Sequence, residues 1–480
     1  MIRNGKKKAI SCALVAAMSV GLAACGTTSY DFKVSYDGIK TGDVSSKVSV
    51  HDPSILKADG EYYIFGSHMS AAKSSDLLNW EKVADGYSKK NPVYGQIYDV
   101  ADEAFAYSGS KNSLIKTDDK QVHVWAPDVI YNETTGLYYM YYCTTSTWNA
   151  SNLCYGTSTT PEGPYEWQGA LIYSGFNRKT ISGTDVLDYV DEDYAYKNYI
   201  KGAQYNYEDY PNAIDPTVFY DADGRMWMVY GSWSGGIFLL EIDKTTGLVI
   251  HPEADEANNV DPYYGKRLLG GGHISIEGPY IMYDETSGYY YLFVSYGALT
   301  SNGGYQVRVF RSKTVDGEYV DMNGKYPEKS AQHQNFGLKL TGNYKLPSLE
   351  KAYMATGHNS AFVDDDGRMY LVYHTRFNDN GEGHSPRVHQ MLVNEDGWPC
   401  ELPYQTQGET VNKDGYDADD IIGRYYVINQ GTAIDSKIAN PVILYLEKNG
   451  KVKGEKSEGT WECKDGSYYM NITIDGKKYS

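Results

Sequence analysis

The chain has 480 residues, of which 41% are hydrophobic and 22% charged, with 62 acidic against 44 basic side chains. This much apolar sequence can form a full core, which excludes a disordered protein as a class. The formal net charge of −18 excludes a nucleic-acid partner, because binding a phosphate backbone needs clustered Lys and Arg. Tyr occurs 48 times, and its preference for strands predicts a β-rich protein.

The first 24 residues have the pattern of an export signal. Basic residues at positions 3, 6, 7 and 8 precede an apolar run over 9–24, which is shorter than the ~20 apolar residues of a transmembrane helix. The run ends at Leu22-Ala23-Ala24-Cys25 and resembles a bacterial lipobox, whose Cys becomes the lipidated first residue of the mature chain. We expect residues 1–24 to be a lipoprotein signal peptide and 25–47 a linker. The remainder is then a soluble body, tethered through Cys25 to the extracellular or periplasmic side of the cell membrane.

The body repeats one pattern five times, over residues 51–66, 125–142, 214–231, 276–296 and 357–374. The pattern is an acidic or polar residue near a Pro, then an apolar strand, a Gly turn and a second, aromatic strand. Gly turns between β-branched and aromatic runs are typical of hairpins, and more strand-like sequence follows each hairpin. Five repeats of about four strands predict an all-β fold, a five-bladed β-propeller over residues 48–400.

After residue 400 the pattern changes to separate short strands with Gly turns between them, as at 421–428, 442–447 and 468–474. This predicts a small, barrel-like β-domain over 401–480, on or beside the propeller. The last residues, 477–480, show no evident closing strand, and we expect the module to be incomplete as written.

Three carboxylates begin repeats at matching positions: Asp52, Asp215 and Glu277. The first strand of every blade lines the axis of a propeller, so these residues should converge at one end of it. Ionised carboxylates are costly to bury, which argues against a purely structural role for three of them. Asp52 and Asp215 each precede Pro, and we expect that step to hold them in an extended conformation.

The sequence around these acids resembles glycoside hydrolase family 43 over residues 48–400. The resemblance rests on His51-Asp52-Pro53, Trp125-Ala126-Pro127-Asp128, 212–216 and 276–280. Within the family the chain is most similar to extracellular endo-α-1,5-L-arabinanases with a C-terminal β-domain, through residues 231–237, 357–360, 373–377 and 387–391.

The resemblance implies an inverting glycoside hydrolase. Inversion uses one carboxylate as base and one carboxylic acid as proton donor, ~6.5–9.5 Å apart so that a water fits between them. By resemblance Asp52 is the general base and Glu277 the general acid. Asp215 would orient Glu277 and raise its pKa through like-charge repulsion.

Further site residues follow from their places in these motifs. We expect the substrate-binding residues to be Trp125, Asp128, Trp148, Asn212, Trp233, His358 and Asn359, with Tyr296 as another sugar platform. Asp128 has a competing interpretation as a hydrogen-bonded residue at a strand entry. The resemblance implies that His374 helps to hold a metal, calcium, whose other ligands are waters. Calcium prefers oxygen ligands, so the residue type alone would not select it.

The expected activity is endo-hydrolysis of α-1,5-L-arabinofuranosidic links in arabinan, including the side chains of pectin, by a monomer. One alternative within the family is an exo-acting β-xylosidase or α-L-arabinofuranosidase. An alternative of another class is a non-catalytic sugar-binding propeller. Cys143 and Cys154 could face each other across a hairpin, and both a disulfide and buried free thiols remain open for the cysteines of the exported body.

Overall fold

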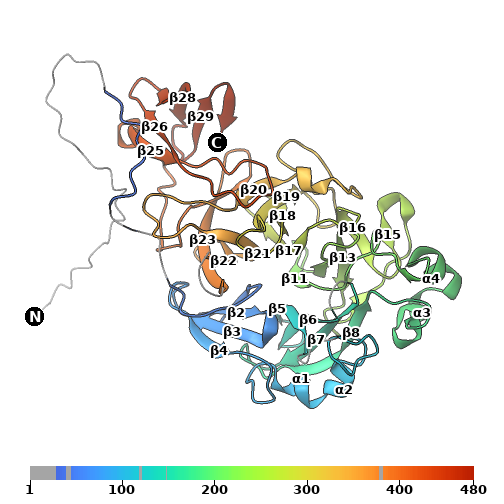
Figure 1. The fold of residues 1–480 in the computed structure, drawn as a ribbon. Coiled ribbons are helices and arrows are strands. Elements are labelled where there is room, and N and C mark those ends of the chain that lie inside the picture. Colours follow the sequence, from blue (N-terminus) through green and yellow to red (C-terminus); the bar gives the residue numbers. More distant parts are fainter. Residues whose placement is uncertain (1–28, 39, 41–44, 118–121, 147–148, 378–381) are drawn as a thin grey trace, which may run out of the picture.

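The computed structural model describes residues 29–38, 40, 45–117, 122–146, 149–377 and 382–480. Within these residues five antiparallel sheets stand around a common axis, and a sixth sheet lies beside them (Figure 1). The fold is therefore the predicted five-bladed β-propeller followed by a C-terminal β-domain.

Four of the blades are plain four-stranded sheets whose strands follow chain order from the axis outwards. Blade 1 comprises β1 (Ser54–Ala58), β2 (Glu61–Gly66), β3 (Ser70–Ser74) and β4 (Glu81–Ala84). Blade 2 comprises β5 (Val124–Asn132), β6 (Leu137–Thr145), β7 (Ser151–Ser158) and β8 (Glu166–Tyr173). Blade 4 comprises β17 (Glu277–Asp284), β18 (Tyr289–Tyr296), β19 (Gln306–Ser312) and β20 (Leu338–Thr341). Blade 5 comprises β21 (Met354–Val363), β22 (Met369–Arg376), β23 (Ser385–Val393) and β24 (Pro399–Glu401).

Blade 3 is larger, and short helices lie in the connections between blades 1 and 2 and between blades 2 and 3. Its sheet comprises β11 (Thr217–Tyr220), β12 (Met226–Tyr230), β13 (Ile237–Ile242), β14 (Val249–Ile250), β15 (Val260–Asp261) and β16 (Gly265–Leu269). A separate hairpin pairs β9 (Ile200–Lys201) with β10 (Gln204–Tyr205). The α-helices of the loops are α1 (Gly95–Asp99), α2 (Ala101–Ala104), α3 (Val186–Tyr189) and α4 (Glu192–Asn198). No helix within the described residues is both long and apolar enough to span a membrane.

The C-terminal domain is a six-stranded antiparallel meander. After the short helix α5 (Ala418–Ile421) come β25 (Gly423–Val427), β26 (Val442–Leu446), β27 (Lys451–Gly454), β28 (Glu458–Cys463), β29 (Met470–Ile474) and β30 (Lys477–Tyr479). The last strand pairs with β29, so the chain end, where the sequence showed no strand, does form one. Arg308 of blade 4 donates to the carbonyl of Thr432 at 2.6 Å, which links this domain's lead-in segment to the propeller.

One backbone conformation recurs where each inner strand begins. Left-handed φ angles occur at Asp52 (56°), Ala126 (40°), Asp215 (55°), Gly278 (55°) and His358 (48°). The expectation that Asp52 and Asp215 are extended is therefore wrong. The left-handed region is unusual for residues other than Gly, and such strain is often kept at functional sites. It occurs here at five matching positions beside the axis.

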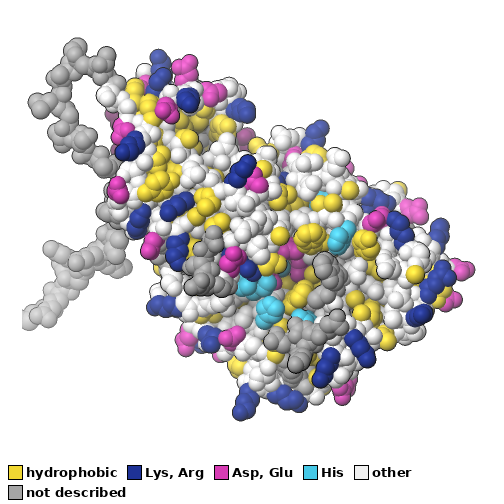
Figure 2. Space-filling model, viewed as in Figure 1, with side chains coloured by type: hydrophobic (Ala, Val, Ile, Leu, Met, Phe, Trp, Pro, Cys, Tyr) yellow, Lys and Arg dark blue, Asp and Glu magenta, His cyan; other side chains and the backbone are white. Residues whose placement is uncertain are grey.

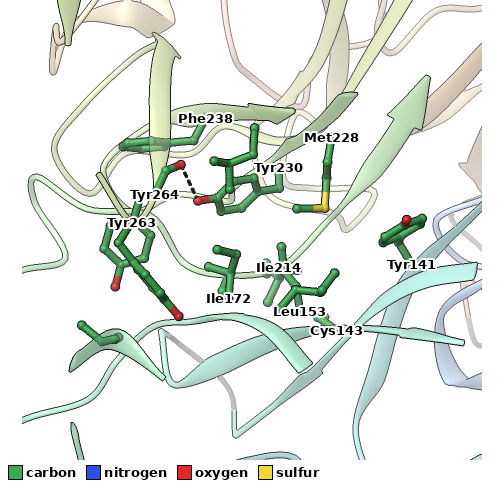
Figure 3. Packing of buried hydrophobic residues seen from close by; sticks show 14 of the residues in the cluster. Tyr141, Cys143, Leu153, Ile172, Ile214, Met228, Tyr230, Phe238, Tyr263 and Tyr264 are labelled. Atoms are coloured by element: carbon green, nitrogen blue, oxygen red, sulfur yellow. Dashed lines mark hydrogen bonds between the residues drawn. The ribbon is translucent and has the colours of Figure 1, made fainter. Parts of the chain in front are cut away.

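Packing between neighbouring blades forms the core. Figure 3 shows the cluster between blades 2 and 3, where Tyr141 and Leu153 face Met228 and Tyr230. The Tyr230 hydroxyl is buried and donates to the carbonyl of Tyr264 at 2.8 Å (Figure 3). A Tyr-rich interface of this kind needs such partners for its hydroxyls.

The cysteines of the described residues are free thiols. Cys143 and Cys154 lie on adjacent strands and are both buried, but Cys143 is opposite Leu153 and Cys154 is opposite Tyr142. The register thus offsets the two residues, which decides between the two alternatives left open by the sequence.

Candidate active site

The five inner strands bring the acidic residues of the repeats together at one end of the propeller axis. Asp52 precedes β1, Asp215 precedes β11, and Glu277 is the first residue of β17. The face shown in Figure 2 carries histidine side chains gathered near its middle. Asp52, Asp215 and Glu277 do converge as predicted. They are close enough for like-charge repulsion by Asp52 to raise the pKa values of the other two.

Asp52 has polar contacts to both of its carboxylate oxygens. Ser67 donates its hydroxyl to Oδ2 at 2.5 Å. His51 Nε2 and His358 Nδ1 lie 3.1 and 3.0 Å from Oδ1. Burial alone would raise the pKa of Asp52, but the neighbouring histidines and the hydroxyl lower it below its ordinary value. Asp52 is therefore an ionised carboxylate at neutral pH.

Glu277 has a different environment. Trp233 Nε1 donates to Oε2 at 2.8 Å, and the Tyr305 hydroxyl donates to Oε1 at 2.7 Å. Burial raises the pKa of Glu277 and the charge of Asp52 adds to the rise, although His358 and the two donors oppose it. The net direction is upward, which favours a protonated carboxylic acid over a wider pH range.

Asp215 lies beside Glu277 and accepts a hydrogen bond from the Gly278 N–H at 3.1 Å. Its pKa is raised by burial first, with Glu277 and Asp52 adding to the rise against His358. The sequence attributed the raised pKa of Glu277 to Asp215. The structure gives burial as the main cause, with Asp52 as a contributing negative charge.

His358 lies among the three acids and is 8% exposed. Burial would lower its pKa, but Asp52, Asp215 and Glu277 together raise it above the ordinary value. An imidazolium here compensates part of the negative charge. The residue predicted to contact substrate is thus an ion-pair partner of Asp52.

Two other predicted substrate ligands face the protein interior. Asp128 is 2% exposed and accepts hydrogen bonds from the Ser54 hydroxyl and from the Val218 N–H, the latter at 2.6 Å. These contacts join blades 1, 2 and 3, so we assign Asp128 the structural role that competed with substrate binding. Asn212 is 3% exposed and accepts a hydrogen bond from the Ser151 hydroxyl at 2.8 Å, which ties the segment before β11 to the start of β7.

Asn359 also differs from its prediction. It is 2% exposed, and neither atom of its side-chain amide has a hydrogen-bond partner within the described residues. It lines a small cavity on the axis instead of an open surface.

The aromatic candidates fall into three groups. Trp125, at the start of β5, and Trp233 are partly exposed, although Trp233 also holds Glu277. Tyr296 is fully buried and cannot stack on a sugar. Trp148 lies outside the described residues, as does Cys25.

His374 lies at the axis near Asp52 and belongs to a group of histidines. The side chains of His51, His374 and His384 place nitrogen atoms within 4.8 Å of one another. Nε2 of His374 is buried and has no hydrogen-bond partner in the part of the chain that the structure describes. The sequence indicated His374 and missed the other two histidines.

Ser67 and Tyr305 are the other residues that the sequence did not single out. Ser67 follows β2 in Gly66-Ser67-His68, and Tyr305 ends the loop between β18 and β19. Neither has a motif or a spacing that would have pointed to a carboxylate partner.

An ionised carboxylate and a carboxyl group with a raised pKa, side by side at the propeller axis, are the two groups that a glycoside hydrolase needs. The family model "Glycosyl hydrolases family 43" matches residues 44–208 and 191–399, and a "C-terminal lipocalin-like domain" matches 403–480. The chain belongs to glycosyl hydrolase family 43.

Similar proteins include the extracellular endo-α-(1→5)-L-arabinanase 2 of Bacillus subtilis, 37% identical over 91% of this chain and 87% of that protein. An extracellular endo-α-(1→5)-L-arabinanase of Thermotoga petrophila is 39% identical over 88% of this chain and 84% of that protein. A crystal structure of endo-1,5-α-L-arabinanase from T. petrophila has a TM-score of 0.74 and 38% identity, covering 91% of this chain and 90% of the other.

Proposed function

We propose that this protein is an endo-acting arabinanase that hydrolyses internal α-1,5-L-arabinofuranosidic links of arabinan, including pectin side chains. The observation that carries the proposal is the contrast between Asp52 and Glu277 on one axis. One carboxyl is kept ionised and the other has a raised pKa. The two similar proteins of B. subtilis and T. petrophila, named as endo-arabinanases, support the substrate and the mode of cleavage.

In this mechanism Asp52 is the general base. The Ser67 hydroxyl and the imidazoles of His51 and His358 contact its carboxylate and fix its direction. Of the two histidines, His358 has the raised pKa, and its positive charge helps to keep Asp52 ionised. It accepts a proton from a water that attacks the anomeric carbon on the face opposite the leaving oxygen, and this attack inverts the configuration.

Glu277 is the general acid in the same step. It gives its proton to the glycosidic oxygen as that bond breaks, and the departing chain leaves as an alcohol. Trp233 and Tyr305 then donate to the carboxylate that remains. Asp215, which is fixed by the Gly278 N–H, orients Glu277 from the side.

We also propose that His374 holds a metal ion. The fit rests on the adjacent nitrogens of His51 and His384 and on the buried Nε2 of His374, which has no partner among the described residues. The family resemblance implies calcium with water ligands, whereas three nitrogen donors would suit a transition metal such as Zn²⁺. When bound, either ion would supply positive charge beside Asp52.

For localisation we propose an exported monomer that is lipid-anchored at Cys25. The relatives of B. subtilis and T. petrophila are named as extracellular, which supports export. The anchor rests on the residues from Leu22 to Cys25 alone.

The test of function compares products and variants. Purified enzyme should release mixed oligomers from linear arabinan, and release of arabinose alone would favour the exo alternative. Glu277→Gln should lose ~10²–10⁴-fold in rate on the polymer while still binding it.

An arabinoside with an activated leaving group separates the two carboxyl roles. This leaving group departs without a proton, so Glu277→Gln should be partly spared on that substrate. Asp52→Asn should be equally impaired on both substrates, because the water still needs its base. Full activity of Glu277→Gln on polymer would refute the acid assignment, and binding without hydrolysis by the unaltered protein would favour the sugar-binding alternative.

A further inference from the structure

A small cavity lies on the propeller axis beside the carboxylates. Its volume is about 10 Å³, which is the room that one water molecule requires. The lining residues come from all the blades that converge here: Asp52, Pro53, Ser54, Ala126, Pro127, Asp215, Pro216, Thr217, Tyr280, His358 and Asn359.

Asn359 breaks a pattern that the other four blades share. The residue that follows the left-handed position is Pro53, Pro127, Pro216 and Pro279 in blades 1 to 4, but Asn359 in blade 5. Proline brings no side-chain donor or acceptor. The fifth blade therefore places a single amide in a ring that is otherwise made of prolines.

This amide is buried, and none of the described residues pairs with it. Asn359 is 2% exposed, and both Oδ1 and Nδ2 lack hydrogen bonds within the described residues. Buried polar groups are rarely left unpaired, because each costs the free energy of its lost hydration. A cavity of the size of a water, lined by an unpaired amide, is the kind of place where ordered water is found.

We propose that this cavity holds one buried water, which hydrogen-bonds to the side-chain amide of Asn359 and to the carboxylate of Asp215. Of the two carboxylates that line the cavity, Asp215 is the one that can accept further hydrogen bonds. Asp52 already engages Ser67 on one oxygen and two histidines on the other. Among the described residues, the carboxylate of Asp215 accepts a single hydrogen bond, from the Gly278 N–H.

Asn359 is then a positioning residue that acts on Asp215 through the water, and this part rests on the proposed function. The groups that interact with Asp215 are Asp52, Cys143, Glu277, Tyr305 and His358. A water that donates to the carboxylate favours its ionised form against burial. In that form Asp215 can orient the protonated Glu277.

The first measurement is a crystal structure of the unaltered protein at a resolution that shows ordered waters. We expect one water within ~2.7–3.2 Å of both the Asn359 amide and the Asp215 carboxylate. A dry cavity, or an Asn359 amide paired to protein atoms, would overturn the proposal. This outcome does not depend on activity, so it separates the water site from the proposed function.

The second measurement is the pH profile of kcat/KM on linear arabinan. Asn359→Leu keeps a similar volume and removes the amide. Its acidic limb should move to higher pH by about half a unit to one unit, because Asp215 loses a donor and its pKa rises. Asn359→Ser leaves room for water and a hydroxyl to hold it, so its limb should lie closer to that of the unaltered enzyme.

The matched control is Asn132→Leu. Asn132 is also a buried Asn, but it ends β5 at the turn, away from the carboxylates, and donates to the Lys244 carbonyl at 2.7 Å. This variant should lose stability without moving the profile. An unchanged profile in Asn359→Leu, or an equal shift in Asn132→Leu, would refute the positioning role even if the water is seen.

Discussion

The indole Nε1 of Trp233 donates a hydrogen bond to Oε2 of Glu277 at 2.8 Å, and Trp233 itself has a left-handed backbone with a φ of 57°. A donor at this place favours the ionised carboxylate, whereas burial favours the neutral acid. Burial is the larger influence and the pKa of Glu277 is raised. Trp233 therefore limits how far the acid's pKa rises, and after proton transfer it stabilises the carboxylate that forms.

Replacing Trp233 by Phe should move the basic limb of the pH profile of kcat/KM to higher pH. The change removes a donor to the ionised form of Glu277, so the pKa of the acid rises and it stays protonated further into the alkaline range. Rate at the optimum should fall as well, by about 10-fold, for loss of one hydrogen bond to a charged group.

Trp227→Phe is the matched control for this variant. Trp227 lies in blade 3 as well and donates its indole N–H to Asp221 at 2.8 Å, in the turn between β11 and β12. Loss of this hydrogen bond should lower stability but should not shift the basic limb of the pH profile. A basic limb of Trp233→Phe that stays put or moves to lower pH would contradict the assignment of Glu277 as the acid.

Asp128 should make stability depend on pH. Burial raises its pKa to about 7, so the folded protein binds a proton that the unfolded chain releases near pH 4. The free energy of unfolding should accordingly fall as pH rises from about 4 to about 7. Asp128→Asn should flatten this dependence in thermal unfolding measured across that range.

Two further variants test the same residue. Asp128→Ala should cost about 1–3 kcal/mol, because the buried Val218 N–H loses its acceptor. Asp221→Asn is the control of opposite sign. The pKa of Asp221 is lowered by its hydrogen bonds from Trp227 and the Arg225 N–H despite burial, so its contribution is lost as pH falls. The same slope in Asp128→Asn as in the unaltered protein would show that another group titrates.

Metal content should depend on His374. Elemental mass spectrometry of the purified protein should find about one metal ion per chain. The His374→Ala variant should lose this ion together with most of its activity. Restoration by Ca²⁺ or by Zn²⁺ after chelation distinguishes oxygen-rich from nitrogen-rich coordination. His333→Ala is the control, since His333 is equally buried but lies against Tyr296. Equal metal content in both variants would show that His374 is not a ligand of the ion.

The lipid anchor predicts that Cys25→Ser releases the protein from membranes. The substitution removes the thiol that would carry the lipid, so the variant should move to the soluble fraction on cell fractionation. Cys12→Ser, within the apolar run, should partition as the parent does. Membrane association of Cys25→Ser equal to that of the parent would show that no lipid is attached there.

The sequence predicted the propeller because its signals are local. An Asp-Gly, Thr-Gly or Ser-Gly turn between two strand-like runs indicates a hairpin, and five such hairpins predict five blades. The acids could also be placed, since equal positions in equal repeats meet at the axis. The positions of Asp52, Asp215 and Glu277 could therefore be predicted without any information on long-range contacts.

The direction of the other side chains could not be predicted in the same way. Asn359 and Asn212 adjoin motif residues, yet both turn into the interior, and their backbone settings depend on neighbouring blades. Tyr305 lies in the connection between β18 and β19 and donates its hydroxyl to Glu277, at the start of β17 in the same blade. A short motif specifies which residues are adjacent in the chain, whereas these contacts arise from packing between distant segments.

Blades 1 and 5 are each made from one continuous stretch of chain, so no strand is shared across their junction. The ring is closed by side-chain packing of residues such as Ile64 and Val372 and by the Ser360 hydroxyl, which donates to the Pro53 carbonyl at 2.9 Å. The junction between first and last blade is then of the same kind as every other junction. The ring should therefore not depend on which blade comes first in the chain, and a circularly permuted gene opened between blades 2 and 3 should encode the same ring.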